Sequence, residues 1–281
     1  MAGGQAVAIH HESTPAAIKL LHRSLNGVIL PGGNSGPMYK DALTLLVNLT
    51  LDAAHGPPGD RVPLWGICLG FEMLVQAVAQ NASVRTSPWD SLLLPLPLNV
   101  SASSRMFRGM PPALRSRMGR ANVTMHNHGA GASPAVFGAD GAGNARLHAT
   151  FDVTSTATDR QGRVFANVIE GKDGLPLFGT IWHPEMPPFE HEIGVIPHSR
   201  AAVQVSQWAA DFFLQLCRDS NRRFPTAEAE AEALITGDAG LLTDCRGEGS
   251  QISECYYWKK KSRPEIQIRH AAAAAAAIRG D

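Results

Sequence analysis

The sequence predicts an α/β fold in which helices cover a parallel β-sheet. Between residues 6 and 79, short apolar runs alternate with segments of helical periodicity. Two of these runs, at residues 27–30 and 62–65, are each followed directly by a glycine turn. Regular alternation of strand and helix is typical of parallel strands joined by crossover helices. The length of 281 residues, with 44% hydrophobic and 18% charged side chains, suits one large domain.

The first part of the chain carries signals for three strands and three helices. Thr14 offers a helix cap, and Pro15 follows at a position that proline favours in the first helical turn. The strands are expected at residues 6–9, 27–30 and 62–65, and the helices at 16–25, 41–54 and 71–79.

The remainder of the domain is more β-like, and prolines interrupt it. Residues 92–100 form its clearest strand signal, and residues 164–170 and 177–182 are expected to pair as strands. The Gly-, Ala- and Ser-rich residues 129–143 predict a loop. Large apolar side chains recur at helical intervals over residues 201–218, which predicts an amphipathic helix on the sheet.

The composition changes near residue 259, where three lysines lead towards seven consecutive alanines at 271–277. This segment has no large apolar face to bury. We therefore predict one domain over residues 1–258, followed by a low-complexity Lys- and Ala-rich tail over residues 259–281 that carries no function.

The charge balance and the cysteine count limit the class of protein. A formal net charge of zero argues against nucleic acid and acidic membranes as partners. No apolar stretch of about 18 residues suits a transmembrane helix. The cysteines, at Cys68, Cys217, Cys245 and Cys255, are too few for a disulfide scaffold, although the last two could pair in an oxidising compartment.

The pentapeptide Gly-Ile-Cys-Leu-Gly at residues 66–70 has the pattern of a nucleophile elbow between a strand and a helix. Its glycines permit a tight turn that exposes the thiol of Cys68, whereas a buried, inert cysteine would not need them. The positive end of the helix dipole favours the reactive thiolate. The backbone N–H of Leu69 would face a developing oxyanion, and Gly33 is the candidate for the second donor. A plain β-turn is the alternative at Gly33.

A histidine and a carboxylate follow the apolar run that ends at Trp182. We expect His183 to deprotonate the thiol and later to protonate a leaving amine, with Glu185 orienting its ring. Active sites of α/β sheets lie at strand ends, which favours this interpretation over a surface turn. Together with Cys68, these residues predict a Cys-His-Glu hydrolase.

Two further histidines, His126 and His128, raise the hypothesis of a zinc site. Nothing in the sequence supplies a third ligand at metal-site spacing, so we predict no metal and favour substrate contact by one of the two. His10, His11 and His198 have no recognisable partners in the sequence, and we interpret them as structural.

The elbow at 66–70 and the Trp-His-Pro-Glu sequence at 182–185 resemble the class I glutamine amidotransferase-like superfamily. The Cys-Leu-Gly-Phe-Glu run at 68–72 is similar to γ-glutamyl hydrolases, because glutaminases usually carry Gln where this chain has Glu72. Other stretches similar to that family are residues 30–33, 96–99 and 182–190, with weaker similarity at 232–235 and 254–257. The resemblance covers roughly residues 5–258.

The resemblance implies a three-layer, flavodoxin-like α/β fold and the hydrolysis of folate poly-γ-glutamates without a cofactor. Cys68 would be the nucleophile, His183 the proton donor and acceptor, and Glu185 its support. His128 would help to hold the substrate, and Glu72 would also contact it. Members of the family are typically lysosomal, vacuolar or secreted, and a homodimer is often their state.

Two observations about the compartment conflict. The acceptor sequons at Asn48, Asn81, Asn99 and Asn122 favour the secretory route, yet no hydrophobic signal core follows Met1. Members of the family normally have a signal peptide, a first strand and a first helix before the region matching residues 4–7. We therefore expect a sheet that lacks this first strand, with unpaired backbone groups and exposed apolar surface. An incomplete gene model or a truncated product would explain this.

Two other functions remain as alternatives. A glutaminase would supply ammonia to a synthase, but Glu72 and the lack of an attached synthase domain argue against it. A non-catalytic homologue would bind γ-glutamyl ligands without turnover, and the presence of Cys68, His183 and Glu185 argues against that.

Overall fold

A five-stranded β-sheet forms the centre of the structure, a computed structural model that describes residues 2–33, 37–140, 143–191, 193–235, 241–244 and 254–257. In spatial order its strands are β1 (Val28–Leu30), β2 (Leu64–Ile67), β7 (Leu177–Thr180), β6 (Val164–Gly171) and β5 (Phe151–Thr158). Two separate pairs are β3 (Ser91–Leu96) with β4 (Thr124–His128), and β8 (Leu241–Asp244) with β9 (Glu254–Tyr257).

The central sheet is parallel at one side and antiparallel at the other. Strands β1, β2 and β7 run parallel, whereas β6 runs antiparallel to both β7 and β5. The predicted α/β class is confirmed, and residues 164–170 and 177–182 do pair, but the sheet is mixed. The connection from β6 to β7 is too short for the crossover helix that parallel strands require.

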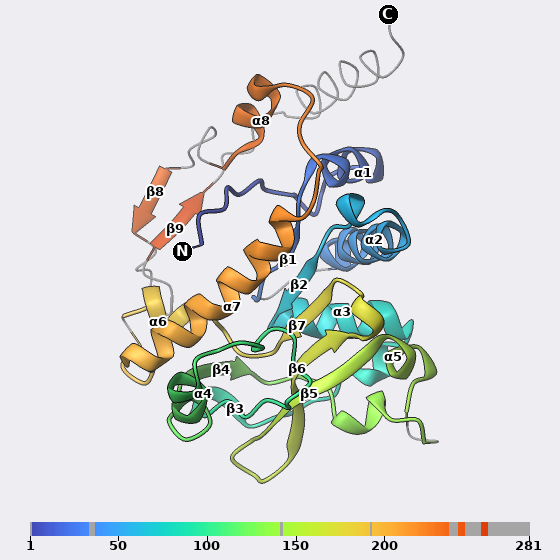
Figure 1. The fold of residues 1–281 in the computed structure, drawn as a ribbon. Helices are drawn as coiled ribbons and strands as arrows, with labels where there is room; N and C mark the ends of the chain where they lie inside the picture. Colours follow the sequence, from blue (N-terminus) through green and yellow to red (C-terminus); the bar gives the residue numbers. More distant parts are fainter. Residues whose placement is uncertain are drawn as a thin grey trace, which may run out of the picture.

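Helices cover both faces of this sheet (Figure 1). One layer contains α1 (Pro15–Ser24), α2 (Pro37–Ala54), α3 (Leu69–Ala79) and α5 (Ala145–Thr150), and the other contains α7 (Arg200–Arg218). The short helices are α4 (Pro112–Met118), α6 (Met186–Phe189) and α8 (Ala227–Ala233). Single turns of 3-10 helix are η1 (Pro58–Asp60), η2 (Ala82–Val84), η3 (Pro134–Phe137) and η4 (Lys172–Gly174). The predicted helices at 16–25, 41–54, 71–79 and 201–218 are confirmed, with small shifts of their ends.

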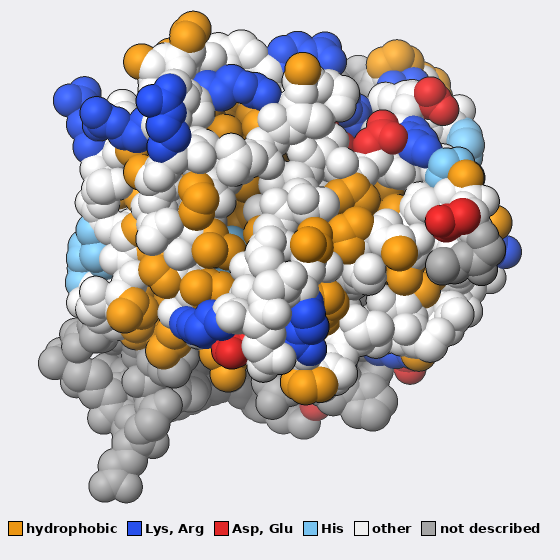
Figure 2. Space-filling view, turned by 90° about the horizontal axis from the view of Figure 1, so that it is seen from below, with side chains coloured by type: hydrophobic (Ala, Val, Ile, Leu, Met, Phe, Trp, Pro, Cys, Tyr) orange, Lys and Arg blue, Asp and Glu red, His pale blue; other side chains and the backbone are white. Residues whose placement is uncertain are grey.

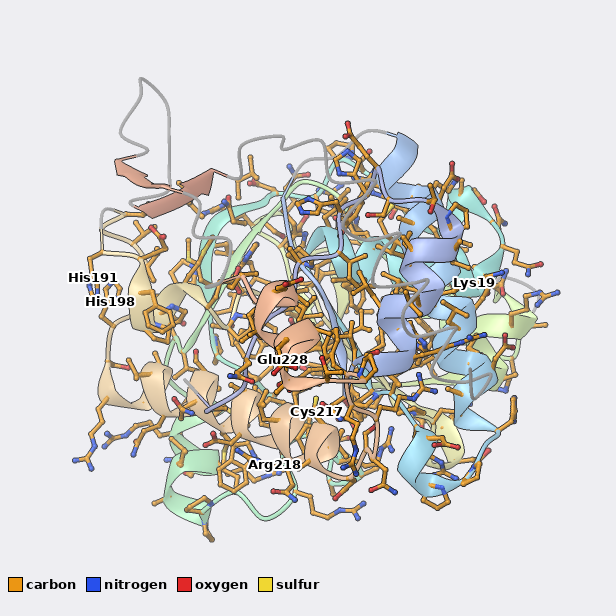
Figure 3. The ribbon with its side chains drawn as sticks, turned by 90° about the horizontal axis from the view of Figure 1, so that it is seen from above. Lys19, His191, His198, Cys217, Arg218 and Glu228 are labelled. Atoms are coloured by element: carbon orange, nitrogen blue, oxygen red, sulfur yellow. The ribbon has the colours of Figure 1, made fainter. Side chains whose placement is uncertain are left out.

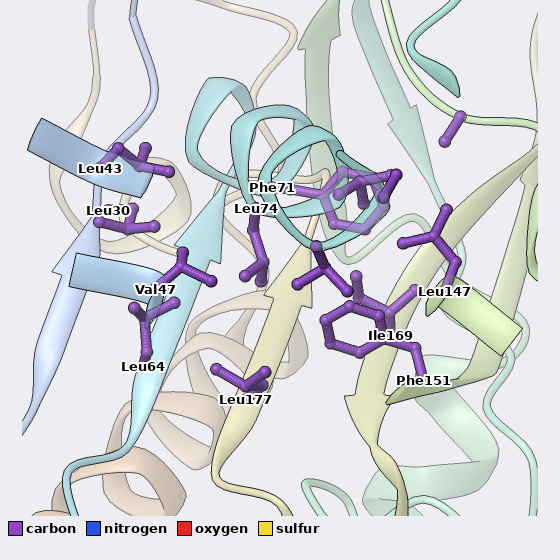
Figure 4. Close-up of a cluster of buried hydrophobic side chains, with 14 of the residues drawn as sticks. Leu30, Leu43, Val47, Leu64, Phe71, Leu74, Leu147, Phe151, Ile169 and Leu177 are labelled. Carbon is purple, nitrogen blue, oxygen red and sulfur yellow. The ribbon is translucent and has the colours of Figure 1, made fainter. Parts of the chain in front are cut away.

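Each face of the sheet has its own hydrophobic core. On the first face, Leu43 and Leu74 of the helices pack with Leu64 and other strand residues (Figure 4). On the second face, Trp65 packs with Phe213 of α7. Successive residues of β2 thus face opposite layers, because side chains alternate along a strand.

The predicted strand at residues 6–9 is wrong. Among the described residues this segment makes one isolated bridge, between Val7 and Leu234, and a groove of about 960 Å³ is lined by residues 2–11 on one side and by β1 on the other. A strand needs a hydrogen-bonded neighbour, and the groove separates residues 6–9 from the sheet. Strand β1 is therefore the edge of the sheet, and its Ile29 is 49% exposed. An open edge with exposed apolar surface is what the sequence led us to expect.

Two strands near the centre were missed from the sequence. Strand β5 is rich in Thr, which favours strands, whereas β4 has little β-propensity in its Thr-Met-His-Asn-His sequence. The strand predicted at 92–100 is confirmed only as far as Leu96.

On the face shown in Figure 2, Lys and Arg side chains lie at several separate places and form no single charged patch. Among the helices that the structure describes, none is long and apolar enough to cross a membrane. The predicted tail at 259–281 lies outside the described residues, as does Cys245, so the suggested pairing of Cys245 with Cys255 is not described.

A buried carboxylate ties the segment before α4 to the sheet. Glu170 of β6 is 2% exposed, and its Oε1 accepts hydrogen bonds from Ser104 Oγ at 2.5 Å and Thr154 Oγ1 at 3.2 Å. Its Oε2 accepts a hydrogen bond from the backbone N–H of Arg105 at 2.7 Å. Every one of these partners donates, so the site is matched to an acceptor with no hydrogen of its own.

We expect Glu170→Gln to lower the free energy of unfolding by roughly 1.5 to 3 kcal/mol, because the amide places N–H against a donor and loses charge-assisted hydrogen bonds. Urea denaturation would measure this change. Glu228→Gln, on the exposed surface of α8 (Figure 3), serves as the control and should change stability by less than about 0.5 kcal/mol. Equal stability of the two variants would contradict this account of Glu170.

Candidate active site

The turn between β2 and α3 has no room for side chains at its two glycines. A Cβ on Gly70 would lie 2.0 Å from the carbonyl oxygen of Leu30, and a Cβ on Gly66 would lie 2.6 Å from the carbonyl oxygen of Gly70. Between them Cys68 has a φ of 51°, in the left-handed region that non-glycine residues rarely adopt. The glycines therefore allow a close crossing of strand and helix that holds Cys68 in a strained conformation.

Cys68 is anchored by its backbone and almost enclosed. Its N–H donates to Thr180 O at 2.9 Å, and its carbonyl accepts from Glu72 N at 3.0 Å. The Sγ atom lies 3.9 Å from Asn127 O, and the residue is 6% exposed. The thiol stands at the N-terminal end of the 11-residue helix α3, where the helix dipole favours a negative charge.

His183 follows β7 and is held from two sides. Its backbone N–H donates to Met125 O of β4 at 2.9 Å, and its Nδ1 lies 2.6 Å from Glu185 Oε1. The ring is buried, whereas the Glu185 side chain is 50% exposed. A carboxylate accepts only, so Nδ1 carries a hydrogen, and the buried Nε2 has no hydrogen-bond partner among the described residues.

The charge state of His183 is set by opposing effects. Burial alone lowers its pKa, but the interactions with Cys68 and Glu185 outweigh burial and raise the pKa from 6.5 to about 10. The imidazolium form of His183 is therefore favoured at neutral pH.

Gly32 packs against both members of this pair. A Cβ at Gly32 would lie 2.9 Å from His183 Cε1 and 3.1 Å from Cys68 Cβ. Its neighbour Gly33 has a φ of +128° and has open space at its Cβ position. The glycine turn after β1 thus reaches the candidate site, with Gly32 making the close approach and Gly33 providing the left-handed backbone.

The structure brings His128 to the same region. Its Nδ1 lies 2.8 Å from Ala130 O, whereas its buried Nε2 has no hydrogen-bond partner among the described residues. Burial is the main cause that lowers the pKa of His128 to about 3, so the ring is neutral. His128 therefore offers a ring nitrogen without a hydrogen-bond partner among the described residues, and its ring is within electrostatic range of His183.

Glu72 is buried beside an arginine that the sequence places 13 residues further along the chain. It is buried one helical turn after Cys68, and its Oε2 accepts a hydrogen bond from Arg85 Nε. Burial raises the pKa of Glu72, and the hydrogen bond and charge of Arg85 oppose that effect. The sequence had given no reason to connect Arg85 with the elbow.

Two further histidines, His191 and His198, contact each other in the segment between α6 and α7. His191 and His198 stack with ring centroids 4.5 Å apart and lie side by side in Figure 3. His198 Nδ1 lies 2.8 Å from Pro187 O, a contact that agrees with a structural role. Within the described ranges no group of three or more His, Cys, Asp or Glu side chains could hold a metal ion.

The arrangement has the parts that acyl transfer needs. A thiol at a tight turn adjoins a buried imidazole, and a carboxylate oxygen lies within hydrogen-bond distance of that imidazole. The backbone carbonyls of Met125 and Asn127, which sequence reasoning did not identify, complete the support from β4.

Comparisons with known proteins identify relatives of this chain. The model of the class I glutamine amidotransferase family matches residues 3–199. Gamma-glutamyl hydrolase B of Dictyostelium discoideum is 31% identical over 83% of this chain and 67% of its own length. Gamma-glutamyl hydrolase of Bos taurus is 32% identical over 83% of this chain and 73% of its own length.

The glutaminase domain of Trypanosoma brucei CTPS has a similar structure, with a TM-score of 0.51 over 76% of this chain and 81% of that domain. At 15% identity this likeness shows a shared fold. Fold and site thus define a class I glutamine amidotransferase-like protein. The chain belongs to that family and, within it, to the γ-glutamyl hydrolases.

We expect Gly32→Ala to reduce the alkylation rate of Cys68 by iodoacetamide by about 10-fold or more, because the added methyl group displaces His183 or Cys68. Mass spectrometry of the modified peptide would give the rate. Gly194→Ala is the matched control, since nothing lies within 4 Å of its Cβ position. An unchanged alkylation rate in Gly32→Ala would contradict this prediction, because the reactivity of Cys68 would not depend on its exact position relative to His183.

Glu185→Gln should lower the pKa of His183 by about 1 to 3 pH units, because the neutral amide no longer stabilises the imidazolium. The pKa of His183 is about 10 in the folded protein against 6.5 for the free side chain. Protonation of His183 therefore stabilises the fold fully below pH 6.5, and this contribution is lost as the pH rises through 10. NMR titration of His183 would measure the change. Asp173→Asn, an exposed acid-to-amide control, should leave the titration in place, and a similar shift in both variants would refute the assignment to Glu185.

Proposed function

We propose that this protein is a cysteine hydrolase that cleaves γ-glutamyl peptide bonds, with folate poly-γ-glutamates as its substrate. The observation that carries the proposal is the position of Cys68, on a strained turn against the His183–Glu185 pair, in a member of the γ-glutamyl hydrolases. The names of the relatives from Dictyostelium discoideum and Bos taurus support the bond type.

In the first half of the reaction, the Cys68 thiolate attacks the γ-carbonyl carbon. The electron pair of the C=O bond moves to oxygen, and the N–H groups of Leu69 and Gly33 stabilise the resulting oxyanion. The carbonyl then reforms as the C–N bond breaks, and His183 gives its proton to the leaving amine. The product on the enzyme is a thioester.

In the second half, water attacks the thioester and gives a proton to His183, which is neutral at this stage. The tetrahedral intermediate collapses, the C–S bond breaks, and the γ-carboxylic acid leaves. Cys68 is again a thiolate beside the imidazolium of His183, and Glu185 holds the ring throughout. In this proposal His128 holds the substrate, and Glu72 with its partner Arg85 is a further candidate for contact.

The second candidate is a glutaminase that supplies ammonia. The fold shared with the glutaminase domain of Trypanosoma brucei CTPS is the observation that favours it. Both functions use the same thioester chemistry, so the leaving group distinguishes them: glutamate or a shortened folate in one case, ammonia in the other.

The proposal extends to the compartment. The four sequon asparagines, Asn48, Asn81, Asn99 and Asn122, are all exposed, which would allow glycosylation in the secretory pathway. We propose a lysosomal, vacuolar or extracellular enzyme that is a glycoprotein and forms a homodimer.

Incubation with folate pentaglutamate, followed by chromatography, tests this function. We expect shortened folates from the unmodified protein and from Cys217→Ala, whose thiol is also buried and has a pKa raised by burial to about 12. Cys68→Ala should lose activity by at least about 1,000-fold. A parallel incubation with glutamine measures ammonia, and ammonia release without cleavage of the folate would favour the glutaminase. Cleavage by Cys68→Ala at the normal rate would exclude the proposed nucleophile.

A further inference from the structure

A chain of buried polar side chains leads from β5 through β6 to β4. The Nδ2 of Asn167 donates to Ser155 Oγ at 3.2 Å, and its Oδ1 lies 3.0 Å from His126 Nε2. His126 and Asn167 are fully buried, and Ser155 is 4% exposed. Buried polar groups destabilise a fold unless they form hydrogen bonds. This series of side chains therefore requires a defined geometry.

The chain ends against His128. The rings of His126 and His128 are 5.7 Å apart, and Phe165 contacts both of them edge-on, at 5.5 Å and 5.0 Å. Residues 126 and 128 occupy the same face of β4, because side chains alternate along a strand. His126 and Phe165 thus form one wall of the space in which the His128 ring lies.

The hydrogen bonding of His128 makes its orientation important. Nδ1 faces Ala130 O, which can only accept, so Nδ1 carries the hydrogen of the neutral ring. Nε2 then carries a lone pair, is buried, and has no partner among the described residues. A nitrogen in this state accepts a hydrogen bond from an N–H or O–H group of a ligand, and a small rotation of the ring would misdirect it.

We propose that His126 is a positioning residue, which holds the His128 ring through its bond to Asn167 and Ser155 so that Nε2 accepts an N–H of the substrate. The inference rests on the proposed function for the identity of the substrate, but the placement of the ring does not depend on it. His126 itself stays neutral, since burial lowers its pKa to about 4, and so adds no charge to the site. It acts through its hydrogen bond and its packing alone.

The first test observes the His128 ring directly, in the full-length protein without substrate. Long-range nitrogen–proton NMR correlations distinguish the two ring nitrogens. We expect the unmodified protein to show the Nδ1–H tautomer, and His126→Phe, which keeps an aromatic ring but loses the bond to Asn167, to show a mixture of tautomers. An unchanged His128 pattern in His126→Phe would overturn the proposal. If that variant does not fold, Ser155→Ala, which removes only the hydroxyl at the far end, replaces it under the same criterion.

The second test is a double-mutant cycle with folate pentaglutamate as substrate. We expect His126→Phe to lower kcat/KM by about 10-fold, mainly by raising KM, and His126→Gln, whose amide can still bond to Asn167, to recover part of the loss. The double variant His126→Phe/His128→Phe should be no slower than His128→Phe alone, because His126 acts through His128. Additive losses would contradict the proposal.

A loss of stability must be separated from a loss of positioning. His22 is another buried histidine, whose Nδ1 lies 3.2 Å from Arg222 Nη1, so His22→Phe is the matched control. It should lower the thermal midpoint yet leave kcat/KM within about twofold. If the unmodified protein does not cleave the substrate, the proposed function fails, and the NMR result alone decides whether His126 positions His128.

Discussion

The structure depends on the close approach of β1, β2 and α3, where only glycine fits. At Gly70 a Cβ would lie 2.0 Å from the carbonyl oxygen of Leu30, so the helix lies directly against the neighbouring strand. This contact forces the chain through a turn in which Cys68 has a positive φ. The same crossing directs the start of α3, and hence its dipole, at the sulfur. Packing, backbone strain and the electrostatics of the thiol therefore have one common origin.

The second support of the site comes from outside the central sheet. Strand β4 pairs with β3 outside the central sheet, yet its Met125 carbonyl accepts a hydrogen bond from the backbone of His183, and its Asn127 carbonyl faces Cys68. The loop after β1 closes the remaining side through Gly32. The candidate residues are thus held by three strand ends of the central sheet and by one strand of a separate antiparallel pair.

The pKa values of the buried histidines in this region are shifted in opposite directions. His126 and His128 have neutral or weak partners, so desolvation dominates and their pKa values fall to about 4 and about 3. His183 is also buried, but Glu185 and Cys68 reverse the effect and raise its pKa to about 10. Buried rings of the same chemical type therefore differ in charge, because His183 alone of these three has partners that stabilise the imidazolium enough to outweigh burial.

Several features of this protein depend only on residues that are close together in the sequence, and these could be predicted from it. Glycines on both sides of Cys68, a histidine two residues before Glu185, and apolar spacing over 201–218 each require only neighbouring residues, and the structure brings Cys68, His183 and Glu185 together as predicted. Contacts between residues that are far apart in the sequence could be established only from the tertiary structure. Asn127 meets Cys68 across 59 positions, and His126 meets Asn167 across 41, and no local pattern records such contacts. The strand expected at residues 6–9 failed for the same physical reason: a strand exists only where a neighbour accepts its hydrogen bonds, and a groove separates this segment from β1.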